Sequence, residues 1–331
     1  MQLGTRSKMS NLQLRLTEDG ILFHDSVLWL DSLYNGEITF FSSAINPRKN
    51  IHPKIIATDQ TSALLKIQRS MPEALICQYN RPFSLGPLTL ELLPSGFMLG
   101  GSSLHIQTEK FSVLYLSEIQ NQPTVCNRKP QFKKADILVI KASDPEPLRP
   151  VPPRKKEKER FGEYVLQHIK RKSWPIVVCP SLPTAPEITQ LLANENITLA
   201  VHSSIYKINN FYKKSGYDLG NYDLFSPNKE YPQSIVLFPS DYTPKNHSHN
   251  YLKKEKIFIH SSLYPTTKSI QQEQFNLAST CSGLDTLKII KDLNPKVLYL
   301  FGPYANKLAK SIKFPLPQIK VMHPNNQPPL L

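Results

Sequence analysis

Residues 175–203 have the sequence PIVVCPSLPTAPEITQLLANENITLAVHS, and this stretch decides the fold class. It opens with an apolar run that ends at Cys179 and continues with APEITQLLANE, whose apolar residues recur at helical spacing. It then returns to the apolar run ITLAV. A strand, a helix and a second strand in this order are typical of a parallel sheet covered by helices. The stretch therefore predicts an α/β protein.

The segments on either side extend this pattern. SIYKINNFYKKSG (204–216) predicts a helix that stops at Gly216. Towards the end of the chain, SGLDTLKIIKDLNP (282–295) predicts a helix with Ser282 as its N-cap, and KVLYLFGP (296–303) predicts a strand. The first third of the chain predicts short strands, closed by ADILVIKAS (135–143), whose continuous apolar run is typical of a sheet buried on both faces.

A domain boundary is expected near Pro145, because residues 145–160 (PEPLRPVPPRKKEKER) are rich in proline and charge. ERFGEYVLQHIKRK (159–172) follows and predicts an amphipathic helix with a basic end.

The overall charge favours anionic partners. The chain has 331 residues with a formal net charge of +14, and 40% of them are hydrophobic, which is ordinary globular usage. Nucleic acid is the first class of partner that this charge suggests, and an anionic membrane surface is the second. A basic but inert surface is the alternative.

The cysteines and the absence of targeting signals indicate a reducing setting. Four cysteines are spaced far apart and form no C-x-x-C pair, so a zinc knuckle or a redox dithiol is not supported. The N-terminal residues lack an apolar signal region, and no apolar run is long enough to cross a membrane. We therefore expect a cytoplasmic protein without a membrane partner.

The order of several motifs matches that of a known family. VLWLD (27–31) is a strand that ends in Asp31, and ATDQTSALL (57–65) fits a strand-to-helix frame of the type Thr-x-x-Thr. LLPSGFMLGGS (92–102) fits a Gly-His motif followed by a Gly-Ser turn. In these respects the chain resembles the β-CASP branch of the metallo-β-lactamase nucleases, and within it the bacterial DNA exonucleases associated with ligase. The resemblance runs from about Asp19 to Lys313.

This resemblance implies an αββα sandwich formed by residues 1–148 and 269–331, with a β-CASP α/β domain inserted at 149–268. It also implies where metal ligands would lie, and most of these positions carry other residue types. They fall on Ser43, Ile45, Pro47, Arg48, Phe97, Glu118, Thr280 and Phe301. Among them only Glu118 is a good metal ligand, and Lys141 stands where the family has an acidic residue. The resemblance therefore implies a degenerate site without metal, cofactor or catalysis.

Three hypotheses about function follow. The first is a pseudonuclease that binds nucleic acid or acts as a scaffolding subunit, in DNA repair or RNA processing. Its phosphate contacts would come from basic residues near the cleft between the domains, which are Arg154, Lys155, Lys156, Lys158, Arg160, Lys170, Arg171 and Lys172. The alternative for this cluster is a solvated linker followed by charges that favour a helix C-terminus.

The second hypothesis is an active metal-dependent DNA or RNA exonuclease with a divergent site, built from Asp31, Glu118, Asp136 and His202. The pair His247 and His249 lies in a polar segment and is interpreted as a solvated loop.

The third hypothesis is a structural partner of another protein, such as an active homologue, a ligase or a helicase. The proline-rich segment 314–331 could dock onto that partner in an extended form, or it could be a frayed terminus.

Overall fold

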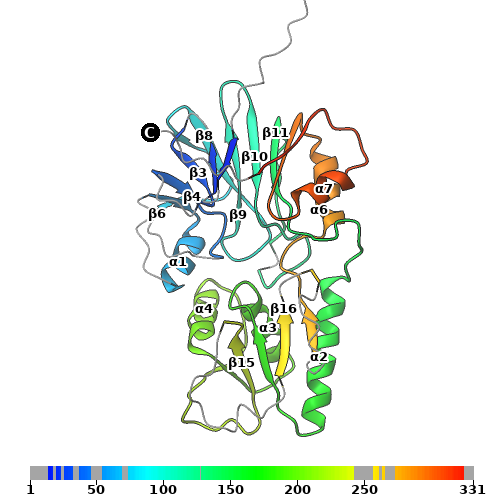
Figure 1. Cartoon of the computed structure of the whole chain (residues 1–331). Coiled ribbons are helices and arrows are strands. Elements are labelled where there is room, and N and C mark those ends of the chain that lie inside the picture. Colours follow the sequence, from blue (N-terminus) through cyan, green and yellow to red (C-terminus); the bar gives the residue numbers. More distant parts are fainter. Residues whose placement is uncertain are drawn as a thin grey trace, which may run out of the picture.

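The chain is an α/β protein with two lobes, which Figure 1 shows one above the other. The computed structural model describes residues 14–17, 20–23, 26–32, 37–45, 54–68, 74–126, 128–241, 256–260, 263–264 and 273–323. The upper lobe of Figure 1 contains two sheets, and the lower lobe contains a third sheet with three helices on it. Pro47, Arg48, His247, His249 and residues 324–331 lie outside the described residues.

The first sheet is built from the start of the chain. Its strands lie in sequence order, with β1 to β3 antiparallel and β3 to β6 parallel. The strands are β1 (Leu14–Thr17), β2 (Gly20–Phe23), β3 (Leu28–Leu30), β4 (Ile38–Phe40), β5 (Ile55–Ala57) and β6 (Ala74–Ile76).

The second sheet has the order β19-β18-β11-β10-β9-β8-β7, antiparallel from β7 to β10 and parallel from β10 to β19. Its strands are β7 (Phe83–Leu85), β8 (Leu88–Pro94), β9 (Ser102–Gln107), β10 (Ser112–Leu116), β11 (Ile137–Lys141), β18 (Val297–Phe301) and β19 (Ile319–Val321). Strand β18 therefore returns to this sheet after the whole lower lobe has been formed.

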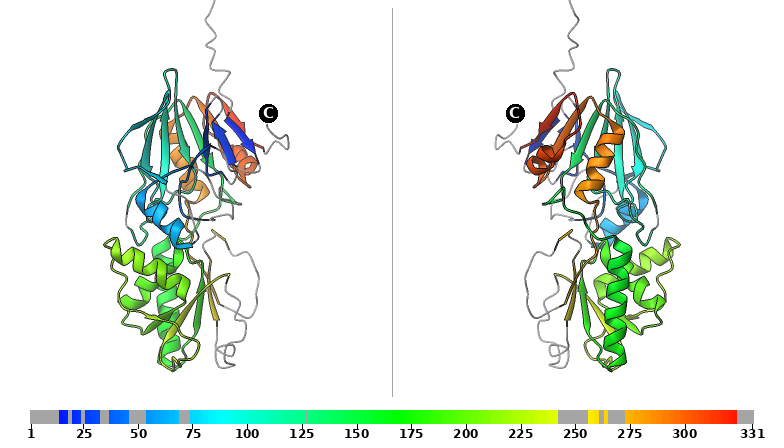
Figure 2. Two further views of the ribbon diagram at one scale, coloured as in Figure 1. Left: turned by 90° about the vertical axis from the view of Figure 1, so that its left-hand side faces the viewer. Right: turned by 90° about the vertical axis from the view of Figure 1, so that its right-hand side faces the viewer.

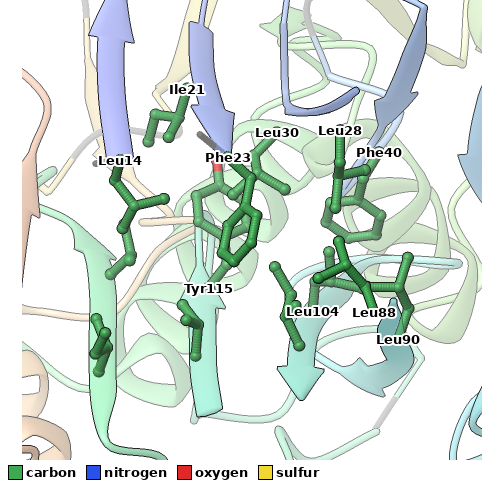
Figure 3. Packing of buried hydrophobic residues seen from close by; sticks show 14 of the residues in the cluster. Leu14, Ile21, Phe23, Leu28, Leu30, Phe40, Leu88, Leu90, Leu104 and Tyr115 are labelled. Carbon is green, nitrogen blue, oxygen red and sulfur yellow. The ribbon is translucent and has the colours of Figure 1, made fainter. Parts of the chain in front are cut away.

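The two sheets pack face to face and enclose the main core. Leu28, Leu30 and Phe40 of the first sheet meet Leu90, Leu104 and Tyr115 of the second (Figure 3). These inward side chains alternate with outward ones, as expected for strands that pack on one another.

Helices cover the outer faces of this sandwich. Helix α1 (Asp59–Gln68) packs Leu64 and Leu65 against Ala57 on the outside of the first sheet. Helices α6 (Gly283–Leu293) and α7 (Ala305–Ser311) cover the outside of the second sheet. The order of layers is therefore α1, the first sheet, the second sheet, and then α6 with α7. The side views of Figure 2 show α6 and α7 against the second sheet.

The third sheet forms the lower lobe and is parallel throughout, in the order β14-β13-β15-β12-β16-β17. Its strands are β12 (Ile176–Cys179), β13 (Leu199–Val201), β14 (Asp223–Leu224), β15 (Ile235–Pro239), β16 (Lys256–His260) and β17 (Gln274–Asn276). Helices α2 (Arg154–Lys170), α3 (Thr184–Asn194) and α4 (Ser203–Lys214) pack their apolar residues into one core with this sheet.

The structure confirms the α/β prediction for residues 175–216, where β12, α3, β13 and α4 follow one another. It corrects the interpretation of residues 154–158, which were expected to belong to the boundary segment and instead form the first turns of α2. Pro153 precedes this helix, and the lysines and glutamates after it are good helix formers. Among the described residues, the helices are all too short or too polar to cross a membrane.

Candidate functional site

The carboxyl ends of parallel strands from both sheets meet at the edge of the sandwich that faces the lower lobe. Strand β3 ends before Asp31, β10 ends before Ser117 and Glu118, and β11 ends at Lys141, beside Phe301 of β18. Ser102 at the start of β9 donates from its backbone to the carbonyl of Ser42, which ties the two sheets together at this edge. Strand ends of this kind are where α/β proteins commonly place functional side chains.

Glu118 and Lys141 form an ion pair at the centre of this edge. Their side chains are 16% and 31% exposed, so both charges are largely withdrawn from water. Lys141 donates to Oε1 of Glu118, and Oε2 has no hydrogen-bond partner among the described atoms. The ammonium group therefore occupies the place beside the carboxylate that a metal cation would need.

Both carboxylate oxygens of Asp31 accept hydrogen bonds from the protein. One carboxylate oxygen accepts a hydrogen bond of 2.7 Å from the backbone N–H of Ser42, and the other accepts one of 2.8 Å from the hydroxyl of Tyr115. Asp31 has a φ of +47°, a conformation that aspartate tolerates better than most residues. Asp31 thus fixes the geometry of the strand ends, and neither of its oxygens is left without a donor.

Aromatic side chains fill the space next to these charges. Tyr115 is buried, stacks on Phe301 with ring centroids 5.7 Å apart, and meets Phe40 edge to face at 6.3 Å. Burial, more than the neighbouring Asp31 carboxylate, raises the pKa of Tyr115 well above its ordinary value, so its hydroxyl remains a neutral donor. Sequence reasoning did not single out Tyr115, because its strand is apolar on both faces and has no alternation that marks the residues facing the first sheet.

Among the remaining positions that the family resemblance implies as ligands, those that the structure describes are buried or partly buried. Phe97 and Ser43 are buried, and Ile45 is partly buried. The loop that carries Thr280 is held by Gln120, whose side-chain amide donates to the carbonyls of Ala278 and Thr280. The described residues contain no group of three or more His, Cys, Asp or Glu side chains that could hold a metal ion. Phenylalanine, isoleucine and lysine offer no ligand to a cation, so these side chains do not fit a two-metal centre.

The divergent metal site is not assembled either. Asp136 precedes β11 and accepts hydrogen bonds from Ser112 at the start of β10, so it lies at the opposite edge of the sheet from Glu118. A strand of this length separates the two edges by about 16 Å. His202 serves as the N-cap of α4, accepting from the backbone N–H of Ser204. The proposed set of Asp31, Glu118, Asp136 and His202 is therefore wrong as one centre.

Arg154 corrects another expectation. It was expected to contact phosphate, but its side chain is buried, with only 4% of the residue exposed. It pairs with Glu187 of α3 and donates a hydrogen bond to the carbonyl of Ala278. Lys158 pairs with the same glutamate. Arg154 therefore joins the start of α2 to α3 and to the segment after β17, where its charge is neutralised and withdrawn from solvent.

The other basic candidates divide into two groups along α2. Arg160 pairs with Glu157 and Glu273 and lies over the ring of Phe275. Lys155 is exposed and lies 3.8 Å from Glu159. The exposed residues without an acidic partner among the described ones are Lys156 near the start of the helix and Lys170, Arg171 and Lys172 at its end. The length of α2 separates these groups by roughly 24 Å, so they form two patches rather than one cluster.

Comparisons with known proteins address the fold and not the activity. No protein-family model and no curated protein matches the sequence. A solved crystal structure of a protein of unknown function from Enterococcus faecalis V583 is similar, with a TM-score of 0.60 and 14% sequence identity. The alignment covers 86% of this chain and 79% of that chain. At this identity the likeness defines an α/β fold alone, so function is argued from the residues of this chain.

Proposed function

We propose that this chain is a catalytically inactive relative of the β-CASP nucleases that binds nucleic acid as a scaffolding subunit. The observation that carries the proposal is the Glu118–Lys141 ion pair, which lies among buried aromatic residues at the strand ends. A lysine beside the one acidic ligand position removes the charge that would attract a metal. At two further positions that the resemblance implies as metal ligands, Phe97 and Phe301 place buried apolar rings.

Two features of the architecture support the assignment to this superfamily. The layer order of helix, sheet, sheet and helices is that of an αββα sandwich. The lower lobe is formed by chain that leaves the second sheet after β11 and returns to it at β18. This is the connectivity that an inserted β-CASP domain would have.

Nucleic acid is the proposed partner because the chain is strongly basic and nucleic acid is an anion. The net charge of +14 is far from neutral, and the exposed cations Lys156, Lys170, Arg171 and Lys172 lie on the outside of α2. Contacts of this kind give affinity for phosphates without reading a base sequence.

The test measures binding, metal content and cleavage on the same purified chain. Binding of labelled single-stranded and duplex DNA and RNA is followed by fluorescence anisotropy, and metal is counted by mass spectrometry after incubation with Zn²⁺ and Mn²⁺. We expect salt-dependent binding, bound metal near zero and no cleavage. One or two metals per chain with metal-dependent cleavage would overturn the proposal, and so would the absence of binding to every oligonucleotide at low salt.

A further inference from the structure

A cavity of about 550 Å³ opens where the two lobes meet, at the carboxyl ends of β5 and β6, and neither Glu118 nor Lys141 lines it. It lies between the start of α1 in the upper lobe and the turn that follows α4 in the lower lobe, which Figure 1 shows next to each other. The polar side chains that line it include Asp59, Gln60, Gln78, Tyr79, Arg128 and Tyr217. Its volume is within the range of pockets that hold small organic ligands.

The wall of this cavity is preformed. The carbonyl of Gly100 accepts hydrogen bonds of 2.8 Å from the hydroxyls of Thr58 and Thr61. Gly100 has a φ of +80°, and a Cβ there would lie 2.5 Å from the backbone nitrogen of Thr61, so the turn and the helix fit only with glycine. Tyr79 closes the same wall, because its hydroxyl donates to the carbonyl of Gly101 at 2.9 Å.

Arg128 supplies a cation to this cavity. Its guanidinium lies over the ring of Tyr79, 5.0 Å from the ring centroid, and no acidic side chain among the described residues pairs with it. An arginine fixed on an aromatic ring retains its N–H donors for a phosphate or a carboxylate. The backbone N–H of Thr61 is already capped by Thr58, so the positive charge of this site comes from Arg128.

The other polar groups suit a flat ring with a polar edge. Gln60 and Gln78 each present a donor and an acceptor on one amide, the combination that pairs with the edge of a nucleobase. Tyr217 provides a ring for stacking, and Met98 and Leu99 give the cavity an apolar side. Asp59 adds a carboxylate, which can accept hydrogen bonds from sugar hydroxyls.

We propose that this cavity is a binding site for a mononucleotide, with the base against Tyr217 and the glutamine amides and the phosphate on Arg128. The inference goes beyond the proposed function, because a free nucleotide can enter this cavity whether or not the chain binds nucleic acid.

Calorimetric titration of the full chain with AMP, GMP, CMP and UMP tests the proposal, with adenosine and inorganic phosphate as partial ligands. We expect at least one nucleotide to bind at least tenfold more tightly than either partial ligand. Arg128→Met should weaken that binding at least tenfold. Lys129→Met is the matched control, because Lys129 is the next residue and is also exposed but does not line the cavity, and it should leave affinity unchanged.

Folding is separated from binding by a second variant and a second measurement. Tyr217→Ala should also weaken nucleotide binding at least tenfold, and unfolding midpoints measured on each variant identify any loss of structure. If no nucleotide binds the native chain, or if both folded variants bind as the native chain does, the inference is overturned. If the native chain binds a nucleotide but no oligonucleotide, the nucleotide site is retained and the proposed function is overturned. If it binds oligonucleotides but no mononucleotide, the proposed function is retained and the nucleotide site is overturned.

Discussion

The hydroxyl of Tyr115 donates a 2.8 Å hydrogen bond to the carboxylate of Asp31, and this contact joins the two sheets of the sandwich at the edge where their parallel strands end. Tyr115 belongs to the second sheet, and Asp31 follows the third strand of the first. The same tyrosine ring stacks on Phe301, so one side chain both closes the edge and orients its acidic residue. An aspartate held in this way contributes to the fold rather than to metal binding.

Tyr115→Phe should therefore lower the free energy of unfolding by about 1.5–3 kcal/mol, the usual range for a hydrogen bond to a charged group. The ring and its stacking remain, so the loss reports the hydrogen bond. Urea unfolding followed by circular dichroism gives the measurement. Tyr206→Phe is the control, because Tyr206 packs edge to face on Tyr222 and its hydroxyl has no partner among the described residues. It should change stability by less than about 0.5 kcal/mol. Equal losses in the two variants would contradict the role given to Asp31.

Glu118 should depend on Lys141 as the partner of its carboxylate. Lys141→Met leaves a largely buried carboxylate without its partner, and we expect a loss of about 1–3 kcal/mol in the free energy of unfolding. The double variant Glu118→Gln with Lys141→Met removes both charges and should recover most of that loss. Urea unfolding of the single and double variants provides the comparison. A double variant as unstable as Lys141→Met alone would mean that the lysine contributes through packing and not through the ion pair.

The sequence predicts the strands and helices of this molecule better than it predicts which groups its charged side chains contact. The strands and helices of residues 175–216 follow from apolar periodicity, and the N-cap at Ser282 follows from local chemistry, as its hydrogen bond with the N–H of Asp285 confirms. Asp136 and Glu118 are members of the same predicted metal site, but only the direction of the strands reveals that they lie at opposite edges.

Arg154 illustrates the same limit. In the sequence it is one more cation in a basic run, and nothing near it marks it as buried. Its partner Glu187 lies in another helix, and the carbonyl it contacts belongs to Ala278, more than a hundred residues away. Contacts across such separations come from tertiary packing and have no local pattern. The cavity with Arg128 and Tyr217 was missed for the same reason.

Arg154→Met should destabilise the fold strongly. It removes one cation from Glu187, which is 6% exposed and keeps only Lys158 as a partner. Removing one member of a buried ion pair costs roughly 3–5 kcal/mol, and we expect a value near the lower end because Lys158 remains. Lys156→Met, two residues along the same helix but exposed, should cost less than about 0.5 kcal/mol. Thermal unfolding of both variants checks the difference, and comparable midpoints would contradict the burial of Arg154.

The end of α2 should contribute to nucleic-acid binding through charge alone. Replacing Lys170, Arg171 and Lys172 by methionine, serine and methionine removes three exposed cations. If each contacts one phosphate of a single strand, the slope of log affinity against log salt should fall by about 2. Fluorescence anisotropy over a series of salt concentrations measures this slope. An unchanged slope would show that these residues are solvated charges at a helix C-terminus and make no phosphate contact.

Asp136 should make the stability of the second sheet depend on acid pH. A hydrogen bond from Lys296, followed by the backbone N–H and the hydroxyl of Ser112, lowers the pKa of Asp136 below its ordinary value of 3.8. A carboxyl whose pKa is lower in the folded state binds its proton more readily when unfolded. Its contribution is therefore fully present well above pH 3.8 and is lost as the pH falls through the folded pKa.

Asp136→Asn should accordingly be less stable than the native chain at pH 7, and the difference should shrink as the pH falls below 3.8. Urea unfolding at a series of pH values checks both the sign and the position of this change. Asp292→Asn is the matched control, because Asp292 is exposed on α6, and the stability difference it causes should vary much less over the same interval. A stability difference for Asp136→Asn that stays constant, or that grows towards acid, would contradict the ion pair with Lys296, since either result requires a folded pKa that is not lowered.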